Sequence, residues 1–227
     1  MPNSSSGLII FVKAPQPGKV KTRLGRSIGM DKSCEVYRQF GRDWIARLNQ
    51  LGLPLLIFYA PQEERPSIQS WLGDSHHYYP QKGGDLGDRM THAFSQGFEL
   101  GFKHLMIFGS DSPDIPLDVI QQGVQKIQGG DIVVGPSNDG GYYSIGFSQK
   151  QWFPEIFENI EWSSESVYQS TIDILSQHHK SVMPLQVWFD VDTLDDLKEL
   201  YLRIQDTQTL PHTLSYLQQH LMNELEP

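Results

Sequence analysis

The sequence predicts an α/β protein with a mostly parallel central sheet. Short apolar runs typical of strands alternate with amphipathic stretches typical of helices as far as Gly135. The first apolar run, residues 8–12, holds five consecutive apolar residues, which is typical of a strand buried on both faces inside a parallel sheet. Together these patterns indicate a sheet with helices on both faces.

The apolar and turn patterns place each element in order along the chain. We predict strands at 8–12, 53–59, 76–79, 104–108, 132–134, 142–147 and 187–191. We predict helices at 31–51, 63–72, around 90–98, and at 117–128, 164–177, 193–203 and 211–222. Residues 13–24, directly after the first strand, contain two prolines and a glycine, so we expect a shaped loop there. No repeat or linker divides the 227 residues, so we expect one domain spanning 1–227.

Composition restricts the classes of partner. The chain has 18 Lys and Arg against 27 Asp and Glu, a net charge of -9, which argues against nucleic acid as a partner. The single Cys34 excludes an internal disulfide and fits a reducing compartment. No apolar run is long enough to span a bilayer, and the first residues do not resemble a signal peptide. We therefore expect a cytoplasmic protein.

A basic loop follows the first strand. Five of the eighteen basic residues fall within fourteen positions: Lys13, Lys19, Lys21, Arg23 and Arg26. A cationic loop at the carboxyl end of a parallel strand is where an α/β fold binds an anionic ligand. The alternative is a solvated surface loop. The prolines and glycine favour a binding loop, because they fix the backbone from which the charges project.

Two other predicted strand ends carry carboxylates. Asp111 follows the strand at 104–108, and Asp192 follows the strand at 187–191, with Asp190 two residues before it. Facing a phosphate-binding loop, Asp111 and Asp192 would hold Mg²⁺ or Mn²⁺. Asp111 could instead be a turn residue, and the role of Asp190 stays open. We expect Asp114 to cap the helix at 117–128, and Thr193 with Asp196 to form a capping box.

The segment Gly83-Gly84-Asp85-Leu86-Gly87 is rich in glycine. Its backbone could approach a flat ligand such as a nucleobase closely, and a flexible turn is the alternative. The fingerprints of P-loop NTPases, Rossmann dehydrogenases, zinc peptidases and α/β-hydrolases are absent from the sequence. Those four classes are therefore not indicated.

One longer segment resembles a known family. Phe11-Val12-Lys13-Ala14-Pro15-Gln16-Pro17-Gly18-Lys19-Val20-Lys21-Thr22-Arg23-Leu24 resembles the opening motif of bacterial GT-A-like glycosyltransferases of the nucleotide-diphospho-sugar transferase superfamily. Further matches follow in the family's order, at 84–90, 109–114, 139–143, 162–164 and 190–193. Some members are known as arsenosugar biosynthesis transferases. The superfamily also contains guanylyltransferases of molybdenum-cofactor and deazaflavin-cofactor synthesis.

The resemblance implies a GT-A-like three-layer sandwich and assigns roles to particular residues. The nucleotide would contact Lys13, Pro15, Gly18, Lys21, Arg23, Gly84, Leu86 and Gly87. The metal would be held by Asp111 and Asp192, and the sugar or acceptor would lie near Asp139, Gly140, Gly141, Trp162 and Ser163. Two departures stand out: Asp111-Ser112-Pro113-Asp114 lacks the D-x-D pattern of many glycosyltransferases, and Ser164 replaces an expected Thr.

The sequence therefore favours a metal-dependent glycosyltransferase with a nucleotide-sugar donor and a small-molecule acceptor. Lys21 and Arg23 would stabilise the leaving diphosphate, and Asp139 would be the candidate base. A nucleotidyltransferase that joins an NTP to a phosphorylated small molecule is the alternative, because it needs the same loop and cation. A non-catalytic nucleotide-binding protein is a second alternative. The retained metal and phosphate residues count against it.

Overall fold

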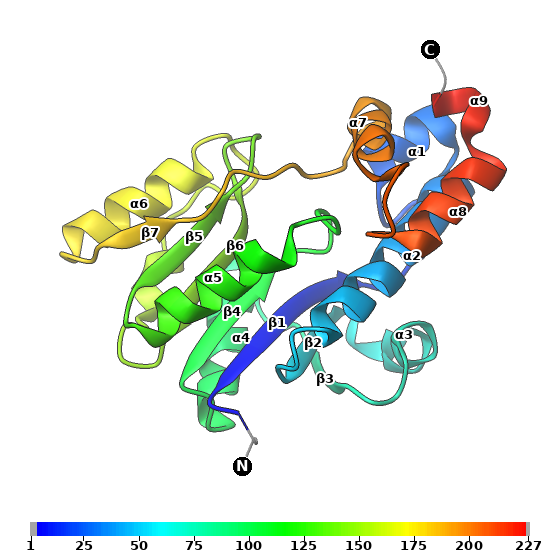
Figure 1. The fold of residues 1–227 in the computed structure, drawn as a ribbon. Coiled ribbons are helices and arrows are strands. Elements are labelled where there is room, and N and C mark those ends of the chain that lie inside the picture. The colour runs from blue at the N-terminus through cyan, green and yellow to red at the C-terminus, as the bar shows by residue number, and fades with distance from the viewer. Residues whose placement is uncertain (1–3, 226–227) are drawn as a thin grey trace.

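The computed structural model describes residues 4–225, and its centre is a seven-stranded sheet of order β3-β2-β1-β4-β6-β5-β7 (Figure 1). The strands are β1 (Ser6–Lys13), β2 (Leu55–Ala60), β3 (His77–Pro80), β4 (His104–Phe108), β5 (Ile132–Pro136), β6 (Tyr142–Ser148) and β7 (Val182–Pro184). All neighbouring pairs are parallel except those of β6, which runs antiparallel to β4 and β5. The predicted mostly parallel sheet is confirmed.

Helices cover both faces of this sheet (Figure 1). One face packs α4 (Leu86–Glu99) and α6 (Val167–Gln177) against a cluster that includes Ile9, Phe94 and Phe147. The other face packs α2 (Met30–Asn49), α3 (Arg65–Leu72) and α5 (Leu117–Gln128), with Trp44 and Ile120 in its core. Two short 3-10 helices, η1 (Gln62–Glu64) and η2 (Pro154–Phe157), lie in the connections that follow β2 and β6.

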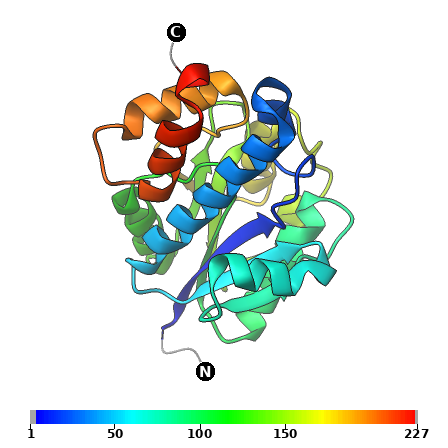
Figure 2. The ribbon, with the colours of Figure 1, turned by 90° about the vertical axis from the view of Figure 1, so that its right-hand side faces the viewer.

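A third apolar cluster lies on the outer side of α2. It joins α2 to α1 (Thr22–Ile28), α7 (Leu194–Ile204), α8 (Pro211–His220) and α9 (Met222–Leu225). Figure 2 shows the carboxyl-terminal helices, in orange and red, beside the blue α2. Phe40, Leu197 and Leu217 are fully buried between these helices. The end of the chain is thereby fixed against its beginning, which brings the segment before α7 near the basic loop.

Two of the predicted elements are wrong. Residues 187–191 do not form a strand: the edge strand is β7, and the later segment makes only the bridge between Ser137 and Trp188. Residues 187–191 leave the edge of the sheet because their backbone bonds to the loop after β4, where the Val191 amide donates to the Asp111 carbonyl at 3.0 Å. The predicted loop after β1 is also too long, since α1 already begins at Thr22.

The remaining elements lie close to their predicted positions. The helix at 117–128 matches α5, and the capping box of Thr193 and Asp196 is present at the start of α7. The predicted final helix is divided into α8 and α9 at Leu221. None of the helices in the part of the chain that the structure describes is long and apolar enough to cross a membrane.

Candidate active site

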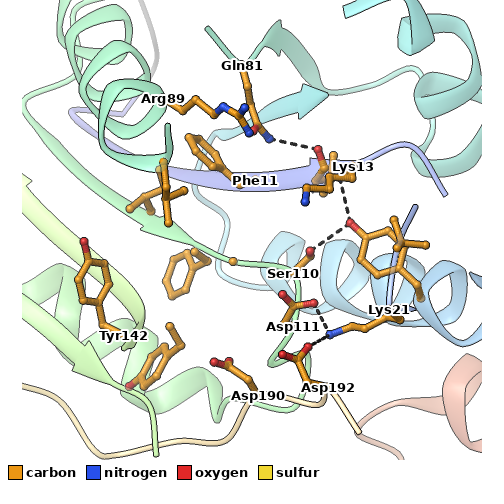
Figure 3. Close-up of a pocket in the computed structure, with 18 of the residues that line it drawn as sticks. Phe11, Lys13, Lys21, Gln81, Arg89, Ser110, Asp111, Tyr142, Asp190 and Asp192 are labelled. Atoms are coloured by element: carbon orange, nitrogen blue, oxygen red, sulfur yellow. Dashed lines mark hydrogen bonds and ion pairs between the residues drawn. The ribbon is translucent and has the colours of Figure 1, made fainter. Parts of the chain in front are cut away.

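A pocket of about 610 Å³ opens at the carboxyl ends of β1 and β4. After β1 the chain continues to β2 on one side, whereas β4 pairs with β1 on the other side. The crevice outside such a reversal of strand order is where open α/β sheets bind ligands. The pocket also has the size of a small-molecule site. Lys13, Ser110 and Asp111 come from the ends of the two strands (Figure 3).

The loop after β1 is shaped by its own backbone, as the prolines and glycine predicted. The Gln16 amide donates to the Ala14 carbonyl at 2.9 Å, and the Lys19 amide donates to the Gln16 carbonyl at 3.0 Å. Gly18 has a φ of 73°, a conformation that a residue with a side chain adopts only at a cost. The loop therefore has a defined path from β1 to Lys21.

Lys21 is the basic residue that the fold buries. Its backbone is left-handed, with φ 45° and ψ 44°, at the start of α1, and its side chain is only 2% exposed. Its ammonium group forms ion pairs with Asp111 and, at 3.3 Å, with Asp192 (Figure 3). Burial alone would lower the Lys21 pKa, but the charges of Asp111 and Asp192 outweigh it and raise the pKa above its ordinary value. Lys21 is therefore a buried, charged group that contacts both carboxylates.

Arg23 stands at the mouth of the same cluster. Its guanidinium lies 3.3 Å from the second carboxylate oxygen of Asp192, and its side chain is 71% exposed. The carboxylates of Asp111 and Asp192 are 46% and 41% exposed, so both face the pocket opening. Two cations and two carboxylates thus share one end of the pocket.

Asp190 lies beside this cluster and accepts a hydrogen bond from the Ser112 hydroxyl. Burial raises the pKa of its carboxyl to about 6, and the nearby charges of Asp111 and Asp139 add to the rise. Asp190 belongs to the same pocket lining as Asp111 and Asp192. Asp190 therefore holds its proton more tightly than an exposed carboxyl group does.

Asp114 connects the two acid-bearing segments. It does not cap α5, which begins after Pro116 without a side-chain cap, so that prediction is wrong. Its buried carboxylate accepts from the Trp188 indole at 3.0 Å and from Arg203 Nε at 2.8 Å. The segment that carries Asp190 and Asp192 is thereby attached to the loop that carries Asp111.

The opposite end of the pocket is formed by Gln81, Arg89 and Phe11 (Figure 3). The Gln81 side-chain amide donates to the carbonyls of Val12 at 3.2 Å and Phe58 at 2.9 Å. Both protons of the NH₂ group are engaged, so the amide oxygen is left as an acceptor. A polar acceptor beside an aromatic ring is suited to a flat heterocycle with an N–H group.

The glycine-rich segment forms a loop and also caps the amino-terminal end of α4. Asp85 accepts from the Asp88 amide at 2.8 Å, and the Gly84 amide donates to Asp88 at 2.9 Å. Gly87 lies in the first turn of α4, where a Cβ atom would lie 2.7 Å from the Phe157 carbonyl and 2.9 Å from Trp162. The absence of a side chain at Gly87 is therefore required by packing within the protein.

Asp139 belongs to a turn rather than to the pocket wall. It accepts from the Ser137 hydroxyl and, at 3.0 Å, from the Gly141 amide. Gly140 has a φ of 87°, and a Cβ there would lie 2.1 Å from the Glu165 carbonyl. This turn is consequently packed tightly against the segment before α6.

The pocket brings together some of the residues predicted from the sequence. Those that line it are Lys13, Lys21, Arg23, Leu86, Asp111, Ser163 and Asp192. Those that do not line it are Pro15, Gly18, Gly84, Gly87, Asp139, Gly140, Gly141 and Trp162. The ligand roles of all these residues stay predictions.

Sequence reasoning missed several lining residues, among them Gln81, Arg89 and Tyr37. The Tyr37 hydroxyl accepts from the Lys13 amide at 2.9 Å and pairs with the Ser110 hydroxyl at 3.1 Å, which joins the ends of β1 and β4. Burial, with the charge of Asp111, raises the Tyr37 pKa to about 12. In the sequence Tyr37 is one apolar-face residue of a helix, whereas Gln81 at a strand end beside the glycines was a usable signal.

The carboxylates of Asp111 and Asp192 lie close enough together for the single ammonium group of Lys21 to contact both. A divalent cation could therefore also be held by the two of them. Among residues 4–225 no group of three or more His, Cys, Asp or Glu side chains could hold a metal ion. Magnesium sites commonly use one or two carboxylates together with substrate phosphates and water. The donor set therefore fits a cation that is shared with a phosphorylated ligand.

Residues 44–164 match the family described as "Uncharacterized protein conserved in bacteria (DUF2064)". This chain belongs to that family. A crystal structure from Desulfovibrio desulfuricans G20, provisionally named a nucleotide-diphospho-sugar transferase, is 38% identical, with a TM-score of 0.91 over 95% of each chain. By sequence, no curated protein matches the chain. The expected bacterial GT-A-like family of nucleotide-diphospho-sugar transferases is thereby confirmed.

More distant structures share the fold. Rv0371c from Mycobacterium tuberculosis H37Rv in complex with manganese has a TM-score of 0.58 at 13% identity, over 88% of this chain and 100% of that chain. A CMP:2-keto-3-deoxy-manno-octonic acid synthetase in complex with CTP has a TM-score of 0.51 at 11% identity, over 89% and 99%. The expected GT-A-like three-layer sandwich is confirmed. Its neighbours include both nucleotide-sugar transferase-like proteins and nucleotidyltransferases.

Proposed function

We propose that this protein is a metal-dependent glycosyltransferase that uses a nucleotide-diphosphate sugar and a small-molecule acceptor. The observation that carries the proposal is the meeting of Lys21 and Arg23 with Asp111 and Asp192 at one end of the pocket. Such a cluster suits a diphosphate and a divalent cation together. The relative at 38% identity, provisionally named a nucleotide-diphospho-sugar transferase, supports this choice.

The side chains would divide the work by position. Lys13, Lys21 and Arg23 would bind the diphosphate and stabilise the negative charge that develops on it as the bond to the sugar breaks. Gln81 and Phe11 would orient the base at the other end of the pocket. Asp111 and Asp192 would hold Mg²⁺ or Mn²⁺, which would supply Lewis-acid stabilisation of the same charge. The manganese complex of the distant Rv0371c protein is consistent with that role.

The acceptor side of the proposal depends on the turn at Asp139. One of its carboxylate oxygens is engaged by Ser137 and Gly141, so the other would take a proton from the acceptor hydroxyl. Gly140, Gly141, Trp162 and Ser163 would surround the sugar or acceptor. The nucleotide side would be shaped by Pro15, Gly18, Gly84, Leu86 and Gly87.

We also propose that residues 1–227 act as one domain and that the protein is cytoplasmic.

A nucleotidyltransferase is the second candidate. It would use the same cations and carboxylates, with an acceptor phosphate attacking the α-phosphate of an NTP and releasing pyrophosphate. The CTP complex of the distant synthetase favours this reading, since that protein shares the fold. The two candidates differ in the bond that breaks.

The experiment that tests the proposal is a product analysis. The protein would be incubated with Mn²⁺ and a panel of nucleotide sugars, without an acceptor. We expect slow release of a nucleoside diphosphate, because water can replace the acceptor poorly. We expect Asp111→Asn to lower that rate about 100-fold or more, as EDTA should, since about 3 kcal/mol of charge stabilisation is lost.

Asp118→Asn is the matched control, because Asp118 is an exposed carboxylate outside the pocket lining. Release that is unchanged by Asp111→Asn and by EDTA would contradict the metal-dependent mechanism. No release from any nucleotide sugar, together with pyrophosphate release from an NTP and a sugar 1-phosphate, would favour the second candidate.

A further inference from the structure

The ammonium group of Lys21 occupies an unusual position in the pocket. It contacts Oδ1 of Asp111 and, at 3.3 Å, Oδ1 of Asp192, and these carboxylates come from separate loops (Figure 3). The Lys21 side chain is 2% exposed, whereas the two carboxylates are 46% and 41% exposed. The carboxylates therefore face the pocket, and the lysine approaches them from inside the protein.

A divalent cation would need the same oxygens. A positive charge a few ångströms away opposes a second cation strongly in a site that is partly shielded from water. No third acidic, histidine or cysteine ligand completes the group among the described residues. A cation alone would therefore meet two carboxylates that Lys21 already neutralises.

A diphosphate changes this balance. Its oxygens can accept hydrogen bonds from the lysine ammonium, and they also complete the oxygen shell that Mg²⁺ or Mn²⁺ prefers. Lys21 has a left-handed backbone, with φ 45°, which costs about 1 kcal/mol or more for a residue with a side chain. Such strained positions occur at functional sites, where the surrounding structure maintains them.

We propose that Lys21 occupies the cation position in the ligand-free protein and makes cation binding dependent on a bound diphosphate. This inference rests on the proposed function, because it takes the cation and the diphosphate from it. When both ligands enter, Lys21 transfers its contacts from the carboxylates to the phosphate oxygens. Because binding free energies are reciprocal, the cation strengthens diphosphate binding by the same factor.

The test measures Mn²⁺ binding rather than activity. Free Mn²⁺ is followed by its electron paramagnetic resonance signal during titration of the wild-type protein, alone and with saturating inorganic pyrophosphate as a diphosphate without a base. We expect pyrophosphate to tighten Mn²⁺ binding about tenfold or more. A protein-free titration corrects for Mn²⁺ held by pyrophosphate in solution.

Lys21→Met removes the ammonium and keeps an unbranched side chain. We expect this variant to bind Mn²⁺ alone about tenfold or more tightly than the wild type, because the competing charge is gone. We also expect pyrophosphate to improve its Mn²⁺ affinity by a smaller factor than in the wild type, because only the ligation by phosphate oxygens remains. Lys150→Met removes the same charge from an exposed position outside the pocket lining, so its Mn²⁺ affinity should stay near that of the wild type.

The possible results distinguish a failure of this inference from a failure of the proposed function. Mn²⁺ affinity that is unchanged or weaker in Lys21→Met, with normal coupling in the wild type, would overturn the inference and leave the proposed function standing. An absence of Mn²⁺ binding to the wild type under both conditions would overturn the metal-dependent function itself. Lys21→Gln serves as a second variant if circular dichroism shows that Lys21→Met does not fold. If neither variant folds, a wild-type coupling factor near one still contradicts the inference.

Discussion

The two sides of the pocket differ in charge and in the part of the chain that supplies them. All the basic residues of the lining, Lys13, Lys19, Lys21, Arg23 and Arg89, precede β4. All the acidic residues of the lining, Asp111, Asp190 and Asp192, follow it. The boundary lies between β1 and β4, and Lys21 is the one basic residue whose ammonium reaches two acids across it.

This difference indicates how each side is organised. On the basic side, the loop that carries Lys19 and Lys21 is shaped by hydrogen bonds within its own backbone. The acidic side depends on links between distant segments, such as the bonds of Asp114 to Trp188 and Arg203. We therefore expect changes on the acidic side to affect stability as well as binding, and changes on the basic side to affect mainly binding.

Asp114→Ala should give the largest effect on the acidic side. Removing the buried carboxylate leaves the Trp188 indole and the Arg203 guanidinium without their acceptor, which should lower the free energy of unfolding by about 2–3 kcal/mol. Urea denaturation at pH 7 measures this loss. Asp118→Ala, an exposed neighbour, is the control. A loss below about 0.5 kcal/mol, the usual size for a surface substitution, would remove the distinction between the two sides.

Asp190→Asn should stabilise the protein, by an amount that depends on pH. Burial raises the Asp190 pKa to about 6, above its ordinary value of 3.8. The folded state therefore holds this proton more tightly than the unfolded state, and the wild type loses stability as pH rises between these values. The variant keeps an acceptor for Ser112 and has no charge to bury, so it should be more stable by about 1–2 kcal/mol above pH 6.

The comparison of Asp190→Asn with wild type uses urea denaturation from pH 4 to pH 8 with EDTA present. We expect the difference in free energy of unfolding to be close to zero at pH 4 and to reach its full size above pH 6. Asp195→Asn, an exposed site in α7, should show no such trend. A stabilisation that is equal at pH 4 and pH 8 would mean that ionisation of Asp190 is not its cause.

Arg23→Ala should give the smallest effect of these substitutions. It tests whether a change on the basic side affects binding without affecting stability. The Arg23 side chain is 71% exposed, so its removal should weaken nucleotide binding about fivefold without changing the melting temperature of the free protein. Isothermal titration calorimetry with a nucleoside diphosphate and Mn²⁺ measures this. Arg26→Ala removes the same charge from α1 at a position outside the pocket lining, and should bind normally. Equal affinities for both variants would exclude a specific contact of Arg23 with the nucleotide.

Local patterns in the sequence determined most of the elements. The apolar run at 8–12 is long enough and sufficiently continuous to specify a buried parallel strand, and it forms the core of β1. The start of α7 follows from the capping box of Thr193 and Asp196, because those contacts lie within one turn of helix. The sequence also indicated Lys21, Arg23, Asp111 and Asp192 individually, through their positions next to strands or predicted strands.

Only the tertiary structure decided which of these residues meet. Lys21 and Asp192 are 171 positions apart, and their contact depends on the strand order and on the packing of α7 to α9 against α2. Asp114 looked like a helix cap because its nearest neighbours in sequence allowed one, but its carboxylate found partners 74 and 89 positions away. Periodicity and capping specify conformation and buried faces over a few residues. They carry no information about which distant groups complete a buried charge or hydrogen bond, and the packing of the whole chain determines that.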